Sequence, residues 1–427
     1  MRRAFVLAWA LLLAAMSQGT APFILWLGSW GHLSQQPESA QAAAVNPGRG
    51  HLNLVSVPNI HGAQELTLNF YSGPAALAFT KQTGISGSFV SGKLGVSPNG
   101  SMYVLGTSTT GVNRQLTLVC ISTTGALKWT KVLATSTTQN FRSLISVDSS
   151  DAVVVAFSVG TQPNFANTIL RIKESNGGTI WTKNFTSPAN LSSLMTGSGV
   201  AVVSHATGTL ITAPTRFRGF IINTGSVAFD KIHDYAAVGL TVFGNINPVS
   251  KEFNMVSHRV LGEPSHVYSV NDQGNVVWIS SLPDSVTQVP VHDASGRIYT
   301  LNGTNTFTYS MVCHSPSGAL IYQTPVPNMS GFLMPDTYGV TADGVCYFMH
   351  EQVVNNQEIF HISEFSPTGQ LNWQSPTPAP WAGLGLFGTM RAILPPSPET
   401  GGTLYMTATV SESVTGTDVG NFYYASP

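Results

Sequence analysis

The stretch STTGALKWTK, residues 122–131, places Gly125 four residues before the large aromatic residue Trp129. The same spacing recurs along the chain in the pairs Gly177/Trp181, Gly225/Phe229, Gly274/Trp278, Gly318/Tyr322 and Gly369/Trp373. A weaker first copy ends at Phe79, where Ala75 occupies the glycine position. Successive aromatic residues lie 44 to 52 residues apart. A period in this range indicates one supersecondary unit per repeat, each burying its apolar face against its neighbours.

Each repeat is typical of four short antiparallel strands. In the second repeat, residues 93–100 and 101–109 form a predicted hairpin through a Pro-Asn-Gly turn, and residues 114–122 and 126–134 follow as two more strands. These runs are rich in Val, Leu, Thr and Tyr and are bounded by Gly, Asn and Ser. The glycine supplies the positive φ of a tight turn, so the next strand carries the aromatic residue outward to pack between units.

Four-stranded units at this spacing predict an all-β fold, a β-propeller, whose closed ring removes long exposed sheet edges. The aromatic residues at 79, 129, 181, 229, 278, 322 and 373 predict seven blades. The last blade, residues 386–427, lacks a fourth strand, and residues 75–82 are the N-terminal strand expected to complete it. Residues 65–72 also resemble a third strand, which leaves open a closure by two N-terminal strands or an eighth, partial blade.

The repeat resembles that of the PQQ-like, quinoprotein-type β-propellers, in which a polar residue and Gly precede Trp. SNGGTIW, NDQGNVVW and SPTGQLNW match this pattern, and the resemblance covers residues 65–427. The resemblance implies the fold but not one function, because proteins with this repeat include quinone-dependent dehydrogenases, envelope assembly scaffolds and many uncharacterised surface proteins. A dehydrogenase would need a calcium-bound quinone with acidic ligands and a catalytic Asp. Here Asp148, Asp151, Asp293 and Asp343 fall in predicted turns, where Asx-turn hydrogen bonding accounts for them, so we expect no cofactor.

The N-terminal segment, residues 1–30, is predicted to be a secretory signal or a retained membrane anchor. Arg2 and Arg3 precede the apolar run Ala4–Met16, and small residues follow. A second apolar patch at residues 23–30 makes residues 4–30 long enough to span a bilayer if the segment is not cleaved. Both readings export the rest of the chain to the periplasm, cell surface or medium. Residues 31–50 are predicted to be a linker and residues 51–427 the propeller.

The charge balance argues against nucleic-acid partners. Charged residues make up 9% of the chain, with 19 basic and 20 acidic residues. A nucleic-acid-binding surface needs a basic excess. The polar surface must therefore come mainly from Ser, Thr, Asn, Gln and Gly.

Three histidines align at the end of the second strand in different repeats: His205, His258 and His350. If they converged they would form a metal or anion site, but equivalent positions in a ring lie at least a channel width apart, and hydrogen bonding to the local chain is the alternative. Whether the protein binds a metal is left open. The cysteines at 120, 313 and 346 are predicted to be buried, small apolar residues.

The loops after the second strands differ most between repeats, as in TSTTGVN (107–113) and EQVVNNQE (351–358). Variable polar loops on one face of a rigid ring are typical recognition sites. We therefore predict an exported, non-catalytic binding or scaffolding module whose partner is a protein or a glycan. Three alternatives remain: a quinone- or metal-dependent oxidoreductase, a polysaccharide-acting enzyme, and a virion or surface-appendage component.

Overall fold

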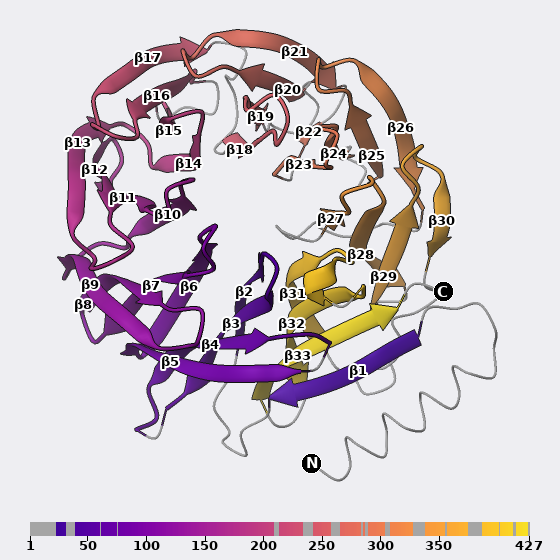
Figure 1. The fold of residues 1–427 in the computed structure, drawn as a ribbon, viewed down its shortest axis with the longest axis horizontal. Coiled ribbons are helices and arrows are strands. Elements are labelled where there is room, and N and C mark those ends of the chain that lie inside the picture. The colour runs from indigo at the N-terminus through magenta and orange to yellow at the C-terminus, as the bar shows by residue number, and fades with distance from the viewer. Residues whose placement is uncertain are drawn as a thin grey trace.

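The computed structural model describes residues 23–30, 39–59, 61–74, 76–208, 213–233, 242–257, 265–282, 285–286, 289–303, 308–327, 338–354, 357–374, 387–400, 402–412 and 416–425. These residues form eight antiparallel sheets arranged around a ring (Figure 1). Each sheet is called a blade, and the blades are numbered 1 to 8 in chain order. Within the described residues, no helix is long and apolar enough to cross a membrane.

The first four blades are each built from four consecutive strands. Their bounds, in order, are β2 (Ser39–Asn46), β3 (Gly50–Pro58), β4 (Gln64–Tyr71) and β5 (Leu77–Gly87) in blade 1; β6 (Phe89–Val96), β7 (Met102–Thr110), β8 (Asn113–Ile121) and β9 (Leu127–Ser136) in blade 2; β10 (Arg142–Val147), β11 (Val153–Thr161), β12 (Asn164–Ile172) and β13 (Thr179–Ser187) in blade 3; and β14 (Leu191–Gly197), β15 (Val200–Ala206), β16 (Thr215–Ile221) and β17 (Val227–His233) in blade 4.

The remaining blades continue the pattern until the last. Their bounds are β18 (Val242–Ile246), β19 (Phe253–Ser257), β20 (Ser265–Val270) and β21 (Val276–Leu282) in blade 5; β22 (Ser285–Val286), β23 (Val291–His292), β24 (Ile298–Gly303), β25 (Tyr309–His314) and β26 (Leu320–Val326) in blade 6; β27 (Tyr338–Val340), β28 (Cys346–Val354), β29 (Gln357–Phe365) and β30 (Leu371–Gln374) in blade 7; and β31 (Phe387–Leu394), β32 (Leu404–Glu412), β33 (Gly416–Ala425) and β1 (Phe23–Trp30) in blade 8, with a 3₁₀ turn, η2 (Pro398–Thr400).

The prediction of an all-β propeller of four-stranded antiparallel blades is confirmed. The aromatic anchors mark the outer strands of blades 1 to 7, which are β5, β9, β13, β17, β21, β26 and β30. Seven sheets have four strands, and blade 6 has a fifth, β23. The eighth unit that the sequence left open is a full blade, because residues 39–87 make a sheet of their own.

An N-terminal strand closes the ring, as expected, but it is a different one. Residues 75–82 were expected to complete the last blade, whereas they lie within blade 1, where β5 pairs with β4. The closing strand is β1, which runs antiparallel to β33 from Phe23↔Ala425 to Trp30↔Val419. The chain therefore brings strands from its two terminal regions into one sheet, as the indigo and yellow arrows show side by side in Figure 1.

The predicted linker, residues 31–50, is partly wrong, because its second half contains β2, the innermost strand of blade 1. Ala40 is fully buried, and Ala42 and Ala44 pack against the core shared by blades 1 and 2. Alanine has a low strand propensity, but small side chains suit an inner strand that lies close to its neighbours. Tertiary packing therefore overrides local propensity here. The anchor or signal hypothesis remains a prediction, because residues 1–22 lie outside the described part.

The repeated glycine and aromatic residues meet between blades. The glycine of each turn lies under the aromatic ring of the preceding blade, so that a Cβ on the glycine would come within 3.0 Å of a ring carbon. The pairs are Gly125 under Phe79, Gly177 under Trp129, Gly225 under Trp181, Gly274 under Phe229, Gly318 under Trp278 and Gly369 under Tyr322. The motif needs glycine for two reasons: φ is positive at this position, and any side chain would collide with the aromatic ring.

Indole N–H groups reinforce this contact between blades. Trp129, Trp181 and Trp278 each donate to a backbone carbonyl in the glycine turn of the next blade, at 2.6, 2.6 and 3.1 Å. Trp373, which precedes the closing blade, donates instead to Glu364 of its own blade. The Gly–aromatic contact thus runs from blade 1 to blade 7 and omits blade 8.

The turns between first and second strands also link the blades, at the same end of the strands as the glycine turns and closer to the channel. Asn46 Nδ2 donates to the carbonyl of Gly100 in the next blade, and Asn247 Nδ2 donates likewise to Gly296. Two of the four expected Asx turns are present: Asp148 Oδ1 accepts the N–H groups of Ser150 and Ala152, and Asp293 Oδ1 accepts those of Ser295 and Arg297. Asp151 instead accepts the N–H of Asn99 from the preceding blade, and Asp343 accepts the hydroxyl of Thr341. These aligned turns hold neighbouring blades in register near the channel.

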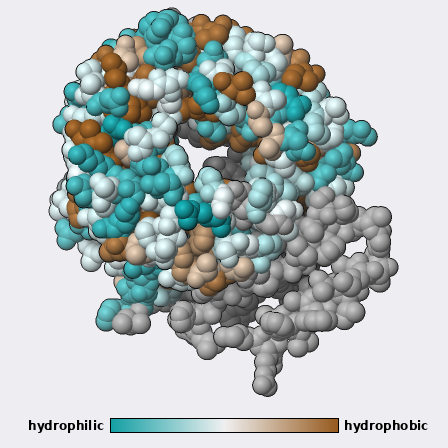
Figure 2. All heavy atoms as spheres, in the orientation of Figure 1, coloured by the Kyte–Doolittle hydropathy of each residue, from teal (hydrophilic) through white to brown (hydrophobic). Residues whose placement is uncertain are grey.

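The core is divided among the interfaces between blades. One cluster joins the apolar faces of blades 1 and 2, another joins blades 2 and 3, and others follow around the ring. Figure 2 shows an opening at the centre of the ring, with polar and apolar residues interspersed around it. Because each blade is covered mainly by its two neighbours, the ring presents its loops from a rigid frame.

Candidate binding site

The aligned histidines do not have comparable environments. His205 is buried, and its Nδ1 lies 2.9 Å from the carbonyl oxygen of Ala206. Burial lowers its pKa, and the nearby guanidinium groups of Arg218 and Arg216 lower it further. His205 is thus hydrogen-bonded to the end of its own strand, which is the alternative to a metal or anion site that the sequence offered.

The other two histidines fall outside what can be described. His258 lies outside the described residues, and His350 is placed only by its backbone, in β28 opposite His361. Within the described part of the chain, no group of three His, Cys, Asp or Glu residues lies close enough to hold a metal ion. A site formed by the three histidines therefore remains a prediction.

The cysteines are buried free thiols, as predicted. Burial raises the pKa of Cys120 to about 12 and that of Cys313 to about 11, and it also raises that of Cys346. The thiolate is the reactive form, so these side chains behave as small apolar core residues.

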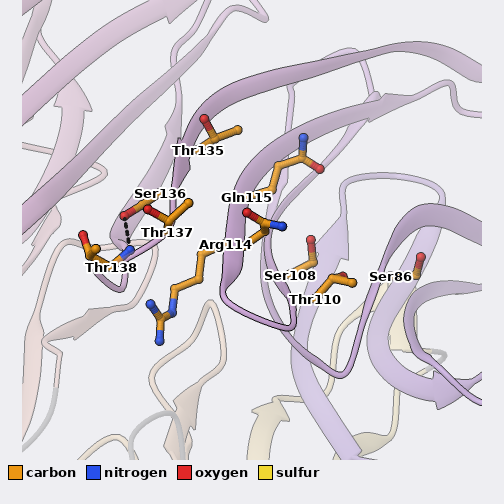
Figure 3. A pocket seen from close by; sticks show the side chains of 10 residues that line it. Ser86, Ser108, Thr110, Arg114, Gln115, Thr135, Ser136, Thr137 and Thr138 are labelled. Carbon is orange, nitrogen blue, oxygen red and sulfur yellow. Dashed lines mark hydrogen bonds between the residues drawn. The ribbon is translucent and has the colours of Figure 1, made fainter.

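A pocket opens on the face that carries the hairpins between second and third strands. The β7–β8 hairpin of blade 2 forms its centre, the end of β5 in blade 1 forms one side, and the connection from β9 to β10 forms the other. Its volume is about 610 Å³. The lining residues are Ser86, Ser108, Thr110, Asn113, Arg114, Gln115, Thr135, Ser136, Thr137 and Thr138 (Figure 3).

Strand register explains how this lining arises. Ser108 on β7 is opposite Gln115 on β8, and Gln115 is opposite Thr135 on β9. Directly paired residues share a face of the sheet, so these polar side chains form a row. One position along β8, Arg114 is opposite Ser136 and points to the other face. The pocket therefore extends over the end of the blade.

The sides of the pocket can be followed in Figure 3. Ser86, Ser108 and Thr110 lie on one side of the hairpin, and Arg114 extends toward the other side, where Thr137 and Thr138 follow β9. Ser136 Oγ accepts the backbone N–H groups of Thr138 and Gln139 at 3.3 and 3.0 Å, which shapes the loop after β9.

Most of the lining side chains form no hydrogen bond or ion pair with the other described residues. Within the described part of the chain, the side chains of Thr110, Arg114, Gln115 and Thr135 make no hydrogen bond or ion pair. Seven lining residues are Ser or Thr, two are Asn or Gln, and Arg114 is the one ionisable residue among the ten. Ligand pockets are usually lined mainly by apolar side chains. This pocket instead offers donors and acceptors to a polar ligand.

The sequence pointed to part of this pocket. The loop TSTTGVN, residues 107–113, was predicted to lie on the recognition face, and it contributes Ser108, Thr110 and Asn113. Ser86 and residues 135–138 were missed, because Ser86 comes from the outer strand of the preceding blade, and residues 135–138 come from the end of β9 and the connection that follows it. The run Thr135–Ser136–Thr137–Thr138 was the available signal, since four hydroxyl side chains in succession mark the point where the strand leaves the core.

Comparisons with known proteins support the fold. No family model and no curated protein matches the sequence. Solved structures do match: the Dos1 propeller at 10% identity over 93% of this chain and 95% of that one, with a TM-score of 0.58; Sqt1 from Chaetomium thermophilum, bound to the N-terminus of ribosomal protein L10, at 11% identity over 93% and 98%, with a TM-score of 0.55; and a europium-containing methanol dehydrogenase at 8% identity over 96% and 94%, with a TM-score of 0.50.

These likenesses define the class of protein that the chain represents. It is a β-propeller, and its likeness to the methanol dehydrogenase, a PQQ-type propeller, supports the fold-level resemblance seen in the repeats. At such low identity the likeness establishes architecture alone. Function has to be argued from the pocket.

Proposed function

We propose that this protein is an exported, non-catalytic propeller that binds a saccharide in the pocket at the end of blade 2. The observation that carries the proposal is the entirely polar lining, in which several side chains have no partner in the described structure. Hydroxyl and amide groups both donate and accept hydrogen bonds, and so do the hydroxyls of a sugar. The basic and apolar N-terminal segment supports export.

A saccharide suits the pocket better than a protein. Protein interfaces are anchored by buried aromatic, aliphatic or arginine residues at their centre. Arg114 is the one residue of these kinds among the ten that line the pocket, and none is aromatic or aliphatic. A protein partner would gain little from apolar burial in this pocket, whereas a polyhydroxylated ligand would replace its water contacts with protein ones.

The lining also favours binding without turnover. Glycoside hydrolysis uses two carboxyl groups placed on either side of the scissile bond. The ten lining residues include no Asp, Glu, His or Cys. They therefore offer hydrogen bonding and one guanidinium, without a general acid and base at the bound ligand.

The test is a binding titration of the full chain against immobilised neutral and acidic oligosaccharides, followed by mass spectrometry of the ligand. We expect saturable binding with no change in ligand mass. Thr135→Val removes one hydroxyl from the pocket and should weaken binding severalfold, whereas Thr130→Val, on the same strand outside the pocket, should leave it unchanged. A cleaved ligand, or no saccharide binding at all, would rule out the proposal.

A further inference from the structure

We infer that the ligand is an anionic saccharide chain, with a carboxylate held by Arg114. This inference rests on the proposed function and specifies the chemistry of the same pocket. Arg114 is the one arginine among the lining residues. Arg171, Arg216, Arg218 and Arg297, which lie elsewhere, each have a carboxylate partner. Arg114 has none within the described residues.

The chemistry of Arg114 favours a ligand that carries an oxyanion. Its guanidinium presents donors in a fork that matches a carboxylate, and charge-assisted pairs of this kind are stronger than neutral hydrogen bonds. No acidic residue lines the pocket to neutralise it. An uncompensated cation among neutral donors and acceptors therefore favours a ligand with many hydroxyls and a carboxylate.

An exposed aromatic ring lies in the same row as Arg114. Four residues on neighbouring strands of blade 2 are paired in a row across the sheet. In order from β6 to β9 they are Phe89, Thr109, Arg114 and Ser136. All four residues therefore point to one face of blade 2. Phe89 is 61% exposed. It lies two strands from Arg114, a spacing of about 10 Å, which is enough to place a flat apolar surface beside the C–H face of a bound sugar ring.

The shape of the pocket favours a chain over a single sugar. The lining runs from Ser86 in blade 1, over the β7–β8 hairpin, to Thr138 beyond β9, and its two sides lie on opposite faces of blade 2 (Figure 3). A monosaccharide would contact one side alone. An extended chain would place one residue against Ser108 and Gln115 and a charged residue against Arg114.

The experiment compares one oligosaccharide with and without its charge. The probes are a hexamer of galacturonic acid and the same hexamer with its carboxylates converted to methyl esters, each titrated against the full chain. We expect the acid to bind at least about tenfold more tightly than the ester, as a charge-assisted hydrogen bond implies. Added salt should weaken binding of the acid and leave binding of the ester almost unchanged.

Two substitutions locate the effect. Arg114→Gln should abolish the preference for the acid and leave the affinity for the ester unchanged. Arg49→Gln is the matched control, because Arg49 is an exposed arginine in the β2–β3 turn and does not line the pocket. Phe89→Ala should weaken binding of the acid and binding of the ester by the same factor, since the contact with the Phe89 ring does not depend on charge. Unchanged thermal unfolding will show that each variant is folded.

The possible outcomes separate the inference from the proposed function. Equal binding of acid and ester overturns the anionic ligand, and an unchanged preference for the acid in Arg114→Gln overturns the role of Arg114. Both outcomes leave saccharide binding standing. If neither hexamer binds and none of the neutral oligosaccharides binds, the inference and the proposed function are both overturned. Binding of a poly-glutamate peptide in place of the sugars, lost in Arg114→Gln, overturns both in favour of an acidic protein partner.

Discussion

Trp181 and Gly225 belong to different blades and hold them together in two ways. A Cβ on Gly225 would lie 2.8 Å from two carbons of the Trp181 indole, and the indole N–H donates at 2.6 Å to the carbonyl of Ile222, three residues earlier in the same turn. The ring and its hydrogen bond thus contact one turn of the next blade. The glycine and aromatic residues that repeat along the sequence are therefore the residues that form the contact between successive blades.

Gly225→Ala tests the space under the ring. The added methyl group must displace the indole, and φ at this position is +67°, which costs an L-residue roughly 1–2 kcal/mol by itself. Displacing the packed ring adds about 1–3 kcal/mol. Gly199→Ala is the control, because φ is +75° there and nothing lies within 4 Å of the added Cβ. Chemical denaturation should show the larger loss for Gly225→Ala, and equal losses would refute the ring contact.

Trp181→Ala tests the aromatic side of the same contact. Trp181 is buried, so its removal should lower the free energy of unfolding by about 3–5 kcal/mol. Trp129 makes the equivalent hydrogen bond but is only half-buried, so Trp129→Ala should cost less. A loss below about 1 kcal/mol for Trp181→Ala would contradict the role given to this residue.

The ion pair between Arg171 and Asp148 provides a second contact to the next blade. Arg171 Nε lies 2.7 Å from Asp148 Oδ2, its Nη1 donates to the carbonyl of Ile222, and both side chains are buried. Asp148→Asn leaves the guanidinium without its counter-charge and should cost about 3–5 kcal/mol.

The control for this pair is exposed. Arg216 and Asp230 form an ion pair at 2.6 Å on the surface of blade 4, so Asp230→Asn should cost less than about 1 kcal/mol. Replacing both Asp148 and Arg171, as Asp148→Asn with Arg171→Met, should recover part of the loss. If the double variant is as unstable as the sum of the single ones, the pairing does not explain the effect.

Two histidines, the fully buried His314 and the half-buried His292, predict that the ring loses stability in weak acid. Burial lowers the pKa of His314 to about 4 and that of His292 to about 4, from an ordinary value of 6.5. The unfolded chain therefore binds more protons than the folded one below pH 6.5. The stabilisation is complete above that pH and is lost as the pH falls toward 4, by up to about 3 kcal/mol for each residue.

Denaturation at several pH values between 7 and 4 measures this loss. His314→Gln removes one titrating group and should flatten the profile in that interval, while it lowers stability at pH 7 through the lost contact with Ser280. A parallel profile in wild type and variant would show that His314 does not titrate as its burial implies.

The position of β1 predicts where the chain tolerates shortening. A chain that begins at Thr20 keeps β1, so it should fold with unchanged stability. A chain that begins at Ala43, as cleavage after the Ala-Gln-Ala sequence at residues 40–42 would leave it, lacks β1 and half of β2, including buried Ala40. Its thermal unfolding should occur at a much lower temperature, corresponding to a loss well above about 3 kcal/mol.

The fold was largely predictable because its information is local and repeated. Each Gly–aromatic pair marks a turn and an outer strand, and the alternating strands follow from their composition. The closing blade was not predictable in the same way. Its outer strand, β1, has no glycine turn before it, so its place is determined by pairing with β33. In blade 1, the inner strand β2 is rich in alanine, so its place is determined by packing against blade 2.

The site was less predictable than the fold. The sequence shows that residues 107–113 form a variable polar loop, but not that Ser86 of another blade lies beside it. Likewise, the absence of a partner for Arg114 depends on the positions of acidic residues in space. Alignment placed three histidines at equivalent strand ends, but equivalence within a repeat is not proximity in a ring.

The pairing of β1 with β33 has a consequence for biogenesis. These strands lie about 390 residues apart in the chain, and at typical rates of synthesis the first would wait tens of seconds or longer for the second. Throughout that time its backbone donors and acceptors are open to any other extended chain. If the chain is exported as proposed, its ring cannot close until translocation is almost complete. We therefore expect a holding chaperone on the receiving side of the membrane to matter more to its yield than any factor that assists the individual blades.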